Sequence, residues 1–152
     1  MLQVLGIEDN KIMLSVDMKE KGYVKKKDTV ISFTRMLDEF VKSRLVHYLA
    51  ADIEGLEMLI LSELIGYGKL SKENITFCQI DIEMHNPTQE SLNPLASKIN
   101  RVQWMLDFVT ELSPYLPIYT VPYQPAHKVS FINYVNSECD KAFNISSRLT
   151  NT

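Results

Sequence analysis

Apolar and polar positions in the middle of the chain follow the pattern of a buried strand that leads into a helix. Residues 45 to 51 are a mostly apolar run of strand length, and the carboxylates Asp52 and Glu54 and the glycine Gly55 follow it at once. Apolar residues then resume at helical spacing. A strand joined to a helix by a short polar turn is the basic unit of an open parallel α/β sheet. The pattern therefore predicts a central strand at residues 45 to 51 and a helix at about residues 56 to 65.

The helix expected at residues 56 to 65 has one apolar face and one polar face. The three- and four-residue spacing predicts that Met58, Leu61, Leu64 and Ile65 are buried. Glu57 and Glu63 fall on the face expected to meet water. Gly66 and Gly68 are expected to end this helix in the left-handed conformation of a C-terminal cap.

The residues before this unit predict a hairpin, a loop and a helix. Short strand-like runs at residues 2 to 7 and 11 to 16 are separated by a polar turn, which indicates a hairpin. Residues 19 to 28 contain five lysines and only one aromatic residue, Tyr23, which makes no aromatic platform for bases, so we interpret them as a solvated loop. A helix is expected over residues 33 to 41, with Ser32 or Thr34 as its cap and with an apolar face of Phe33, Met36, Leu37, Phe40 and Val41.

The residues after this unit predict a second strand, a long helix and an antiparallel hairpin. Alternation over residues 75 to 84 places Thr76, Cys78, Ile80, Ile82 and Met84 on one face and Phe77, Gln79, Asp81, Glu83 and His85 on the other. A long helix is expected from Asn93-Pro94 to about residue 113, with Leu95, Ile99, Val102, Leu106, Val109 and Leu112 on its apolar face. Residues 117 to 123 and 128 to 135 are strand-like and closely linked, which indicates a hairpin. A helical turn at 137 to 143 and a flexible tail at 144 to 152 complete the expected order.

Length, charge and cysteine content narrow the class of protein. A chain of 152 residues is expected to form one domain, and its net charge of -3 gives no reason to expect nucleic acid as a partner. No apolar run approaches the roughly 18 residues of a membrane-spanning helix. Two cysteines do not make a disulfide framework, so we expect Cys78 to be an inert core thiol and the chain to be cytoplasmic. The glycosylation triplets that begin at Asn74 and Asn144 are common by chance and are set aside.

Polar side chains with chemical potential gather at the ends of the two predicted parallel strands. Asp52 and Glu54 follow the first strand, and Glu83 and His85 end the second. Strands joined by a helical crossover often lie side by side, so the four side chains are expected to share one crevice. Carboxylates and an imidazole suit general-base catalysis, and they are also ligand types for a divalent cation. The alternatives are structural, because Glu54 could cap the following helix and Asp52 could accept a hydrogen bond from a loop amide.

The motifs at these strand ends resemble those of FkbM-type methyltransferases, and of their nematode branch in particular. The similar residues are Val30-Ile31-Ser32-Phe33 with Leu37-Asp38, Asp52-Ile53-Glu54-Gly55-Leu56-Glu57, Gln79-Ile80-Asp81-Ile82-Glu83-Met84-His85, and Phe131-Ile132-Asn133-Tyr134-Val135 with Glu138-Cys139. The resemblance implies a Rossmann-like class I fold with central parallel strands, flanking helices and a C-terminal antiparallel hairpin. It also implies S-adenosylmethionine as cofactor and a small-molecule or glycan acceptor, usually methylated on oxygen. Asp52, Glu54, Glu83 and His85 are the expected catalytic residues, Asp52 and Gly55 the expected cofactor contacts, and no metal is expected.

The chain departs from this family in its first part. Such enzymes carry the cofactor on a glycine-rich turn between an early strand and its helix, and Gly6, Gly22, Gly55, Gly66 and Gly68 form no such turn. We therefore expect residues 1 to 143 to be a truncated methyltransferase-like domain that lacks the cofactor-binding half. A half-sheet exposes a strand edge, through which self-association is expected.

Three functions remain open at this point. The first is methyl transfer, which the missing cofactor half could abolish. The second is a non-catalytic module, derived from a methyltransferase, that binds a partner or a small molecule. The third is a divalent-metal-dependent hydrolase that uses Asp52, Glu54, Glu83 and His85, although no hydrolase motif accompanies the cluster.

Overall fold

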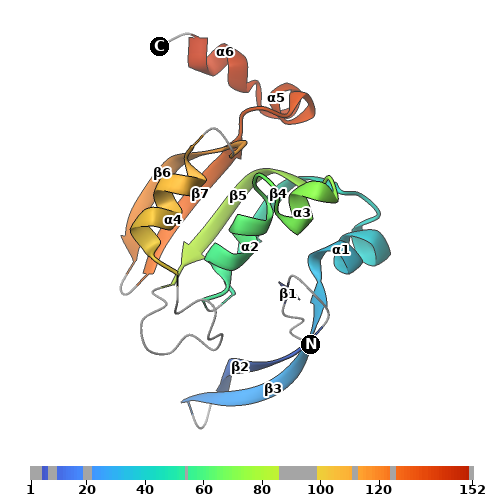
Figure 1. Ribbon diagram of the computed structural model, residues 1–152, viewed down its shortest axis with the longest axis vertical. Coiled ribbons are helices and arrows are strands. Elements are labelled where there is room, and N and C mark those ends of the chain that lie inside the picture. Colours follow the sequence, from blue (N-terminus) through green and yellow to red (C-terminus); the bar gives the residue numbers. More distant parts are fainter. Residues whose placement is uncertain are drawn as a thin grey trace.

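The computed structural model describes residues 5–6, 10–18, 22–53, 55–85, 99–110, 113–123 and 126–150. It shows an α/β structure with a three-stranded sheet of order β1-β3-β2 and a four-stranded sheet of order β4-β5-β7-β6 (Figure 1). The expected α/β class is therefore confirmed. None of the helices in these ranges is both long enough and apolar enough to cross a membrane.

The four-stranded sheet combines one parallel pair with an antiparallel hairpin. Strand β4 (Leu45–Ala51) runs parallel to β5 (Thr76–Met84). Strand β7 (Ala126–Asn133) pairs antiparallel with β5, and β6 (Tyr115–Tyr123) pairs antiparallel with β7. The sequence predicted these strands and the hairpin, but it placed β4 at the centre. In this sheet β4 lies at an edge and none of its residues is fully buried.

The three-stranded sheet differs from the predicted hairpin and loop. Strand β2 (Asn10–Met18) pairs antiparallel with β3 (Gly22–Ser32), while β1 (Leu5–Gly6) pairs parallel with β3. The lysine-rich residues, expected to form a loop, therefore lie largely in a strand. Pairing of β2 with β3 satisfies the backbone hydrogen bonds whatever the side chains are. The lysine-rich part of β3 lacks apolar alternation, so the sequence pattern did not indicate a strand there.

A short helical segment follows β3 and leads into the edge strand β4. It consists of α1 (Phe33–Met36) and one π-helical turn, η1 (Leu37–Val41). Ser32 is the cap, because its Oγ accepts a hydrogen bond from the backbone N–H of Arg35 at 3.2 Å. Phe33 and Leu37 are buried as predicted, whereas Phe40 and Val41 are exposed because the π-turn rotates them away from the core.

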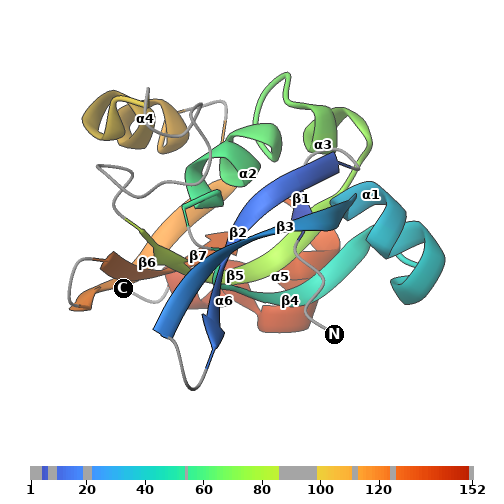
Figure 2. The ribbon, with the colours of Figure 1, turned by 90° about the horizontal axis from the view of Figure 1, so that it is seen from below.

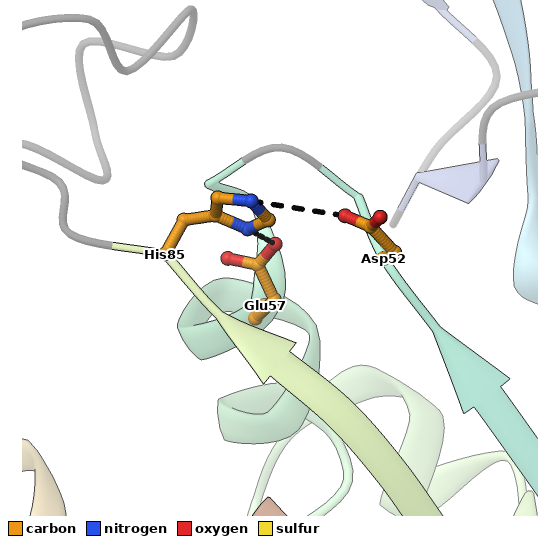
Figure 3. Close-up of side chains that lie close together, drawn as sticks. All are labelled: Asp52, Glu57 and His85. Carbon is orange, nitrogen blue, oxygen red and sulfur yellow. Dashed lines mark hydrogen bonds and ion pairs between the residues drawn. The ribbon is translucent and has the colours of Figure 1, made fainter. Parts of the chain in front are cut away.

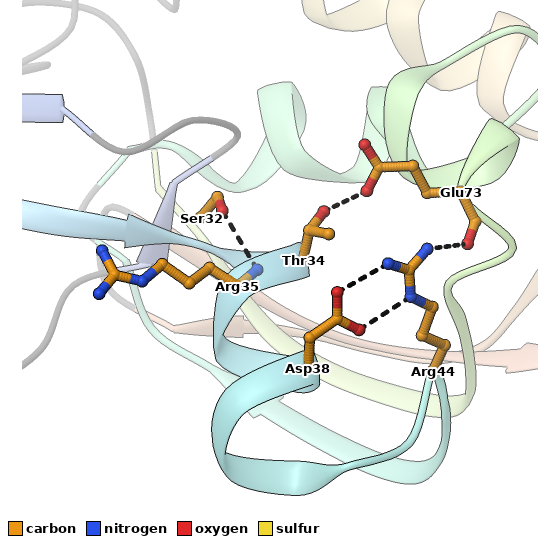
Figure 4. A network of polar contacts seen from close by, with 6 residues as sticks. All are labelled: Ser32, Thr34, Arg35, Asp38, Arg44 and Glu73. Atoms are coloured by element: carbon orange, nitrogen blue, oxygen red, sulfur yellow. Dashed lines mark hydrogen bonds and ion pairs between the residues drawn. The ribbon is translucent and has the colours of Figure 1, made fainter.

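Arg44 fastens this segment to the turn before β5 (Figure 4). Its guanidinium donates two hydrogen bonds to the carboxylate of Asp38, at 3.0 and 2.7 Å, and one to the carbonyl oxygen of Glu73 at 2.8 Å. The Asp38 contact is bidentate, and this hydrogen bonding lowers the pKa of the Asp38 carboxyl. Thr34 also donates to the side chain of Glu73. These contacts fix the start of β4 beside the start of β5.

Helices α2 (Glu57–Glu63), α3 (Lys69–Lys72) and α4 (Arg101–Phe108) lie on one side of the four-stranded sheet (Figure 2). Met58, Leu61 and Leu64 are buried as predicted, but Glu57 is only 1% exposed. The prediction that Glu57 lies in water is therefore wrong. The first turn of α2 stands beside the end of β5, and His85 covers Glu57 there.

Helix α4 is shorter than predicted and buries a different face. It is capped by Asn100, whose Oδ1 accepts hydrogen bonds from the backbone N–H groups of Val102 and Gln103. The predicted start at Asn93-Pro94 lies outside the described residues. Trp104 and Phe108 face the core, while Val102, Leu106 and Val109 are exposed. The two aromatic rings stack at 4.9 Å between centroids, and Trp104 Nε1 donates to Ser62 Oγ at 2.7 Å. These contacts outweigh the aliphatic pattern.

The turn between α2 and α3 depends on two glycines for different reasons. Gly66 has φ 50° and adopts the left-handed conformation predicted for it. Gly68 has φ -60°, so the prediction of a left-handed cap is wrong at this position. A Cβ on Gly68 would lie 2.4 Å from the carbonyl oxygen of Glu63. Close approach of two backbone segments, not backbone conformation, therefore requires glycine here.

Gly68→Ala is expected to lower the free energy of unfolding by about 1–3 kcal/mol, because backbone must move to admit the methyl group. Chemical denaturation measures the change. Tyr67→Ala is the matched control in the same turn. Tyr67 is 84% exposed, so its loss should change stability by less than about 0.5 kcal/mol. Equal stability of Gly68→Ala and the unaltered chain would contradict the close approach.

A second, smaller core joins the sheet to helices α5 (Ser137–Phe143) and α6 (Ile145–Thr150), on the side away from α2 (Figure 2). Cys78 and Cys139 form a disulfide there, both with no exposed surface, and Ile145 packs against them. The expectation of an inert core thiol at Cys78 is therefore wrong. The expected flexible tail is helical from Ile145 to Thr150 because buried Ile145 anchors it.

Burial along β5 also differs from the predicted alternation. Phe77 belongs to the same core cluster as Ile80, Ile82 and Met84, whereas Cys78 belongs to the smaller core with Cys139. Both faces of β5 are covered near its start, so neighbouring residues are buried together. Burial alternates only from Gln79 onward.

Candidate functional site

The candidate site lies where the parallel strands β4 and β5 end. Leu45 to Ala51 of β4 pair in register with Thr76 to Ile82 of β5, which brings the segments that follow both strands to the same edge of the sheet. Asp52 follows β4 and His85 follows β5 (Figure 3). The prediction that these two strand ends lie side by side is confirmed. Ligands of open α/β sheets commonly bind at such an edge.

Glu57 and His85 form the central contact of the site. His85 Nδ1 lies 2.8 Å from Glu57 Oε1, and the glutamate is 1% exposed while the histidine side chain is 22% exposed. When Nδ1 carries the proton it donates to the Glu57 carboxylate, and Nε2 is then the ring nitrogen on the side of Asp52 and Glu83. The contact orients the imidazole so that Nε2 lies toward Asp52 (Figure 3).

Two further carboxylates lie near Nε2 of His85. Nε2 lies 3.6 Å from Glu83 Oε1 and 3.8 Å from Asp52 Oδ1. The Glu83 side chain is 19% exposed, and its Oε2 lies 3.8 Å from Lys128 Nζ. The Asp52 side chain is 62% exposed. The structure thus brings together three of the four predicted catalytic residues. Glu54 lies outside the described residues.

Gly55 shapes the turn between β4 and α2. Its φ of 99° lies in the region that favours glycine, and its N–H donates to Glu57 Oε1 at 3.0 Å. The same carboxylate oxygen therefore receives hydrogen bonds from Gly55 and His85. The N–H of Gly55 donates to Glu57 and so helps to hold that side chain in place. It is therefore not available for the cofactor contact expected at Gly55.

A hollow of about 570 Å³ opens beside Asp52 and Glu83. Its lining includes Asp81, Lys128 and Tyr119 from three neighbouring strands. Burial raises the pKa of Asp81, but hydrogen bonds from Gln79, Ser130 and Tyr48 outweigh burial and leave this pKa below its usual value. Asp81 is therefore an ionised, hydrogen-bonded acceptor in a space of the size that small ligands occupy.

Replacing Glu57 by glutamine is expected to lower the free energy of unfolding by about 1–2 kcal/mol. The amide oxygen can still accept hydrogen bonds from Gly55 and His85, but a neutral amide oxygen forms weaker hydrogen bonds than a carboxylate oxygen. Urea denaturation measures the loss. Glu63→Gln in the same helix is the matched control, because its partly exposed side chain can still accept from the Lys69 N–H. Equal losses in the two variants would contradict a special role for Glu57.

Sequence reasoning missed Glu57 as a site residue because helical periodicity assigned it to the solvent face. Its place in the first turn of a helix that starts at the carboxyl edge of the sheet was an available signal. A side chain there lies near the strand ends whatever the average polarity of its helical face. The histidine two residues beyond the predicted Glu83 was the natural partner to test.

No model of a known protein family, no curated protein and no solved structure matches this chain. The chemical role of the site therefore rests on its geometry and on the resemblance of its motifs.

Proposed function

We propose that this chain is part of an S-adenosylmethionine-dependent O-methyltransferase, in which His85 takes the proton from the acceptor hydroxyl. The observation that carries the proposal is the 2.8 Å contact between His85 Nδ1 and the buried Glu57 carboxylate. It orients the imidazole so that Nε2, which we assign as the base, lies at the edge of the sheet near Asp52 and Glu83. The parallel pair β4 and β5 and the antiparallel finish of β6 and β7 agree with the arrangement that the motif resemblance implies.

Each residue of the site has a separate part in this proposal. Nε2 of His85 accepts the hydroxyl proton, and Glu57 stabilises the imidazolium ion that results. Asp52 and Glu83, on either side of Nε2, accept hydrogen bonds from neighbouring hydroxyl groups of the acceptor. A small molecule or a glycan in the hollow would contact Asp52 and Glu83, the two carboxylates that lie 3.8 and 3.6 Å from Nε2.

The described residues fit the acceptor side of such a site better than the cofactor side. S-adenosylmethionine, when bound, supplies an electrophilic methyl group. Within the described ranges no strand leads into a helix through a turn with several glycines, which is the usual means by which backbone approaches a nucleoside. Asp52, with its exposed carboxylate, is the described residue that remains as a candidate cofactor contact.

Methyl transfer and cofactor binding are tested separately. Calorimetry with S-adenosylmethionine measures binding to the chain, and a radiolabelled methyl group measures transfer to a panel of hydroxyl-bearing small molecules and glycans. Transfer that requires His85 supports the proposal. Cofactor binding without transfer to any acceptor would favour a non-catalytic module, and absence of both would exclude methyl transfer by this chain alone.

A divalent cation is a second candidate ligand, because Asp52, Glu57 and His85 offer ligand atoms that all lie within 4.8 Å of one another. Carboxylate oxygen and imidazole nitrogen suit Mn²⁺ or Zn²⁺. A rise in melting temperature with MnCl₂ that is lost in an Asp52→Ala/His85→Ala variant would show cation binding at this cluster, which a metal-dependent hydrolase requires. Equal melting temperatures with and without MnCl₂ would exclude it.

A further inference from the structure

The Cys78–Cys139 disulfide indicates the kind of compartment in which the chain acquires its final structure. These are the two cysteines of the sequence, and both have no exposed surface. Disulfides form and persist mainly in oxidising compartments and are rare where glutathione keeps thiols reduced. Asparagine-linked glycosylation is a modification of secreted proteins. In an oxidising compartment of the secretory route, unlike in the cytoplasm, the two triplets of the sequence could be glycosylated.

The first triplet, Asn74-Ile75-Thr76, places its asparagine in a turn. Asn74 follows α3, has φ 57° and is exposed. Its backbone N–H donates to the carbonyl oxygen of Ser71 at 3.0 Å. Among the residues that the structure describes, its side-chain amide has no hydrogen-bond partner. The amide is therefore accessible to solvent and is not needed to hold the turn.

The second triplet, Asn144-Ile145-Ser146, has the same local form. Asn144 is the left-handed C-cap between α5 and α6, with φ 54°, and it is exposed. Its backbone N–H donates to the carbonyl oxygen of Asp140 at 2.7 Å. Its side chain likewise makes no hydrogen bond within the described part of the chain.

The middle residue of each triplet anchors it to the core. Ile75 is 3% exposed and Ile145 is 5% exposed, so each asparagine is held at a turn from which its side chain can reach solvent. A large polar group on the amide nitrogen can extend into water without displacing a core side chain. Turns of this kind accommodate a glycan, whereas an asparagine such as Asn133, which is 3% exposed, does not.

We propose that Asn74 and Asn144 carry asparagine-linked glycans, added in the compartment in which the Cys78–Cys139 disulfide forms. In the transfer, the amide Nδ2 forms a bond to the anomeric carbon of an oligosaccharide carried on a polyprenyl pyrophosphate. The bond from that carbon to the pyrophosphate oxygen breaks, the polyprenyl pyrophosphate leaves, and the amide loses one proton. The disulfide forms by exchange with a protein disulfide, which accepts the two electrons and two protons of the thiols.

Glycans at these positions leave the candidate site open. Asn74 lies just before β5, and His85 lies just after it. A strand of nine residues spans roughly 30 Å. Helices α5 and α6, with Asn144 between them, also lie toward the end from which β5 starts (Figure 1). The inference does not depend on the proposed methyl transfer, and neither fails with the other.

Peptide mapping of the protein isolated from its own cells tests the proposal. Release of glycans by peptide N-glycosidase in ¹⁸O-labelled water converts a glycosylated asparagine into labelled aspartate. We expect the label at Asn74 and at Asn144, and a Cys78–Cys139 linked peptide without reductant. Asn86-Pro87-Thr88 is the internal control, because proline in the middle position prevents glycosylation. Unlabelled Asn74 or Asn144, or free thiols at Cys78 and Cys139, would overturn the proposal.

Substitutions give a second measurement that does not depend on isolating peptides. Asn74→Gln and Asn144→Gln are each expected to remove one step of electrophoretic mobility from the protein expressed in the same cells. Ser146→Thr keeps the triplet and the hydroxyl that donates to Asp140, so its mobility should equal that of the unaltered protein. The same mobility for Asn144→Gln and the unaltered protein would contradict glycosylation at Asn144.

Discussion

Replacing Cys78 and Cys139 together by alanine is expected to lower the free energy of unfolding by about 4 kcal/mol. The two residues are 61 positions apart, and in the chain-entropy account a cross-link over that length removes about this much conformational freedom from the unfolded state. In the folded state the disulfide also holds α5 against β5, where Ile145 completes the smaller core. Urea unfolding without reductant measures the difference.

Dithiothreitol supplies the control for the disulfide prediction. Reductant should destabilise the unaltered protein by a similar amount, and it should leave the double alanine variant unchanged. Because both cysteines are fully buried, reduction is expected to be slow until the protein unfolds. Equal stability of the two proteins in the absence of reductant would mean that the cross-link contributes nothing.

If the proposed methyl transfer holds, replacing His85 by glutamine is expected to lower its kcat/KM by about 10²–10⁴-fold, the usual contribution of a positioned general base. Glutamine can still approach Glu57, but its amide nitrogen cannot accept a proton. If the base acts only in the chemical step, KM for S-adenosylmethionine should remain unchanged. Initial rates with the labelled methyl donor measure both constants.

His47→Gln is the matched control for this prediction. His47 is an exposed histidine on the neighbouring strand β4. Its replacement should leave kcat/KM within about twofold, a change smaller than 0.5 kcal/mol. An equal fall in both variants, or transfer that survives in His85→Gln, would remove the histidine from the catalytic role.

Much of the four-stranded sheet could be predicted from the sequence because its strands have strong apolar runs. The strands at Leu45–Ala51 and Thr76–Met84 were predicted almost to the residue, and the antiparallel hairpin that follows was predicted with bounds up to two residues from those observed. The adjacency of the two strands came from a general rule on helical crossovers, and it correctly placed Asp52, Glu83 and His85 together.

The features that sequence reasoning missed depend on contacts between distant segments. Nothing near Cys78 in the sequence indicates that Cys139 lies against it, because Cys139 belongs to α5, which follows the β6–β7 hairpin in the chain. Glu57 is buried because His85, which follows β5, covers it, although the position of Glu57 on its helix predicted that it would be exposed to solvent. The lysines of β3 do not show the apolar pattern of a strand, and β3 pairs with β2 through backbone hydrogen bonds. Trp104 and Phe108 determine the buried face of α4, and aliphatic spacing alone pointed elsewhere.

The disulfide also has a consequence for the integrity of the chain. Cys78 and Cys139 enclose the rest of β5, α4 and the whole β6–β7 hairpin within one covalent ring. A protease that cuts a single bond between these two residues opens the ring but does not separate the pieces, since the sulfur bridge still joins them. A nicked molecule would therefore keep all of its residues covalently joined until it meets a reductant, and it would keep β5 and β7 within reach of one another.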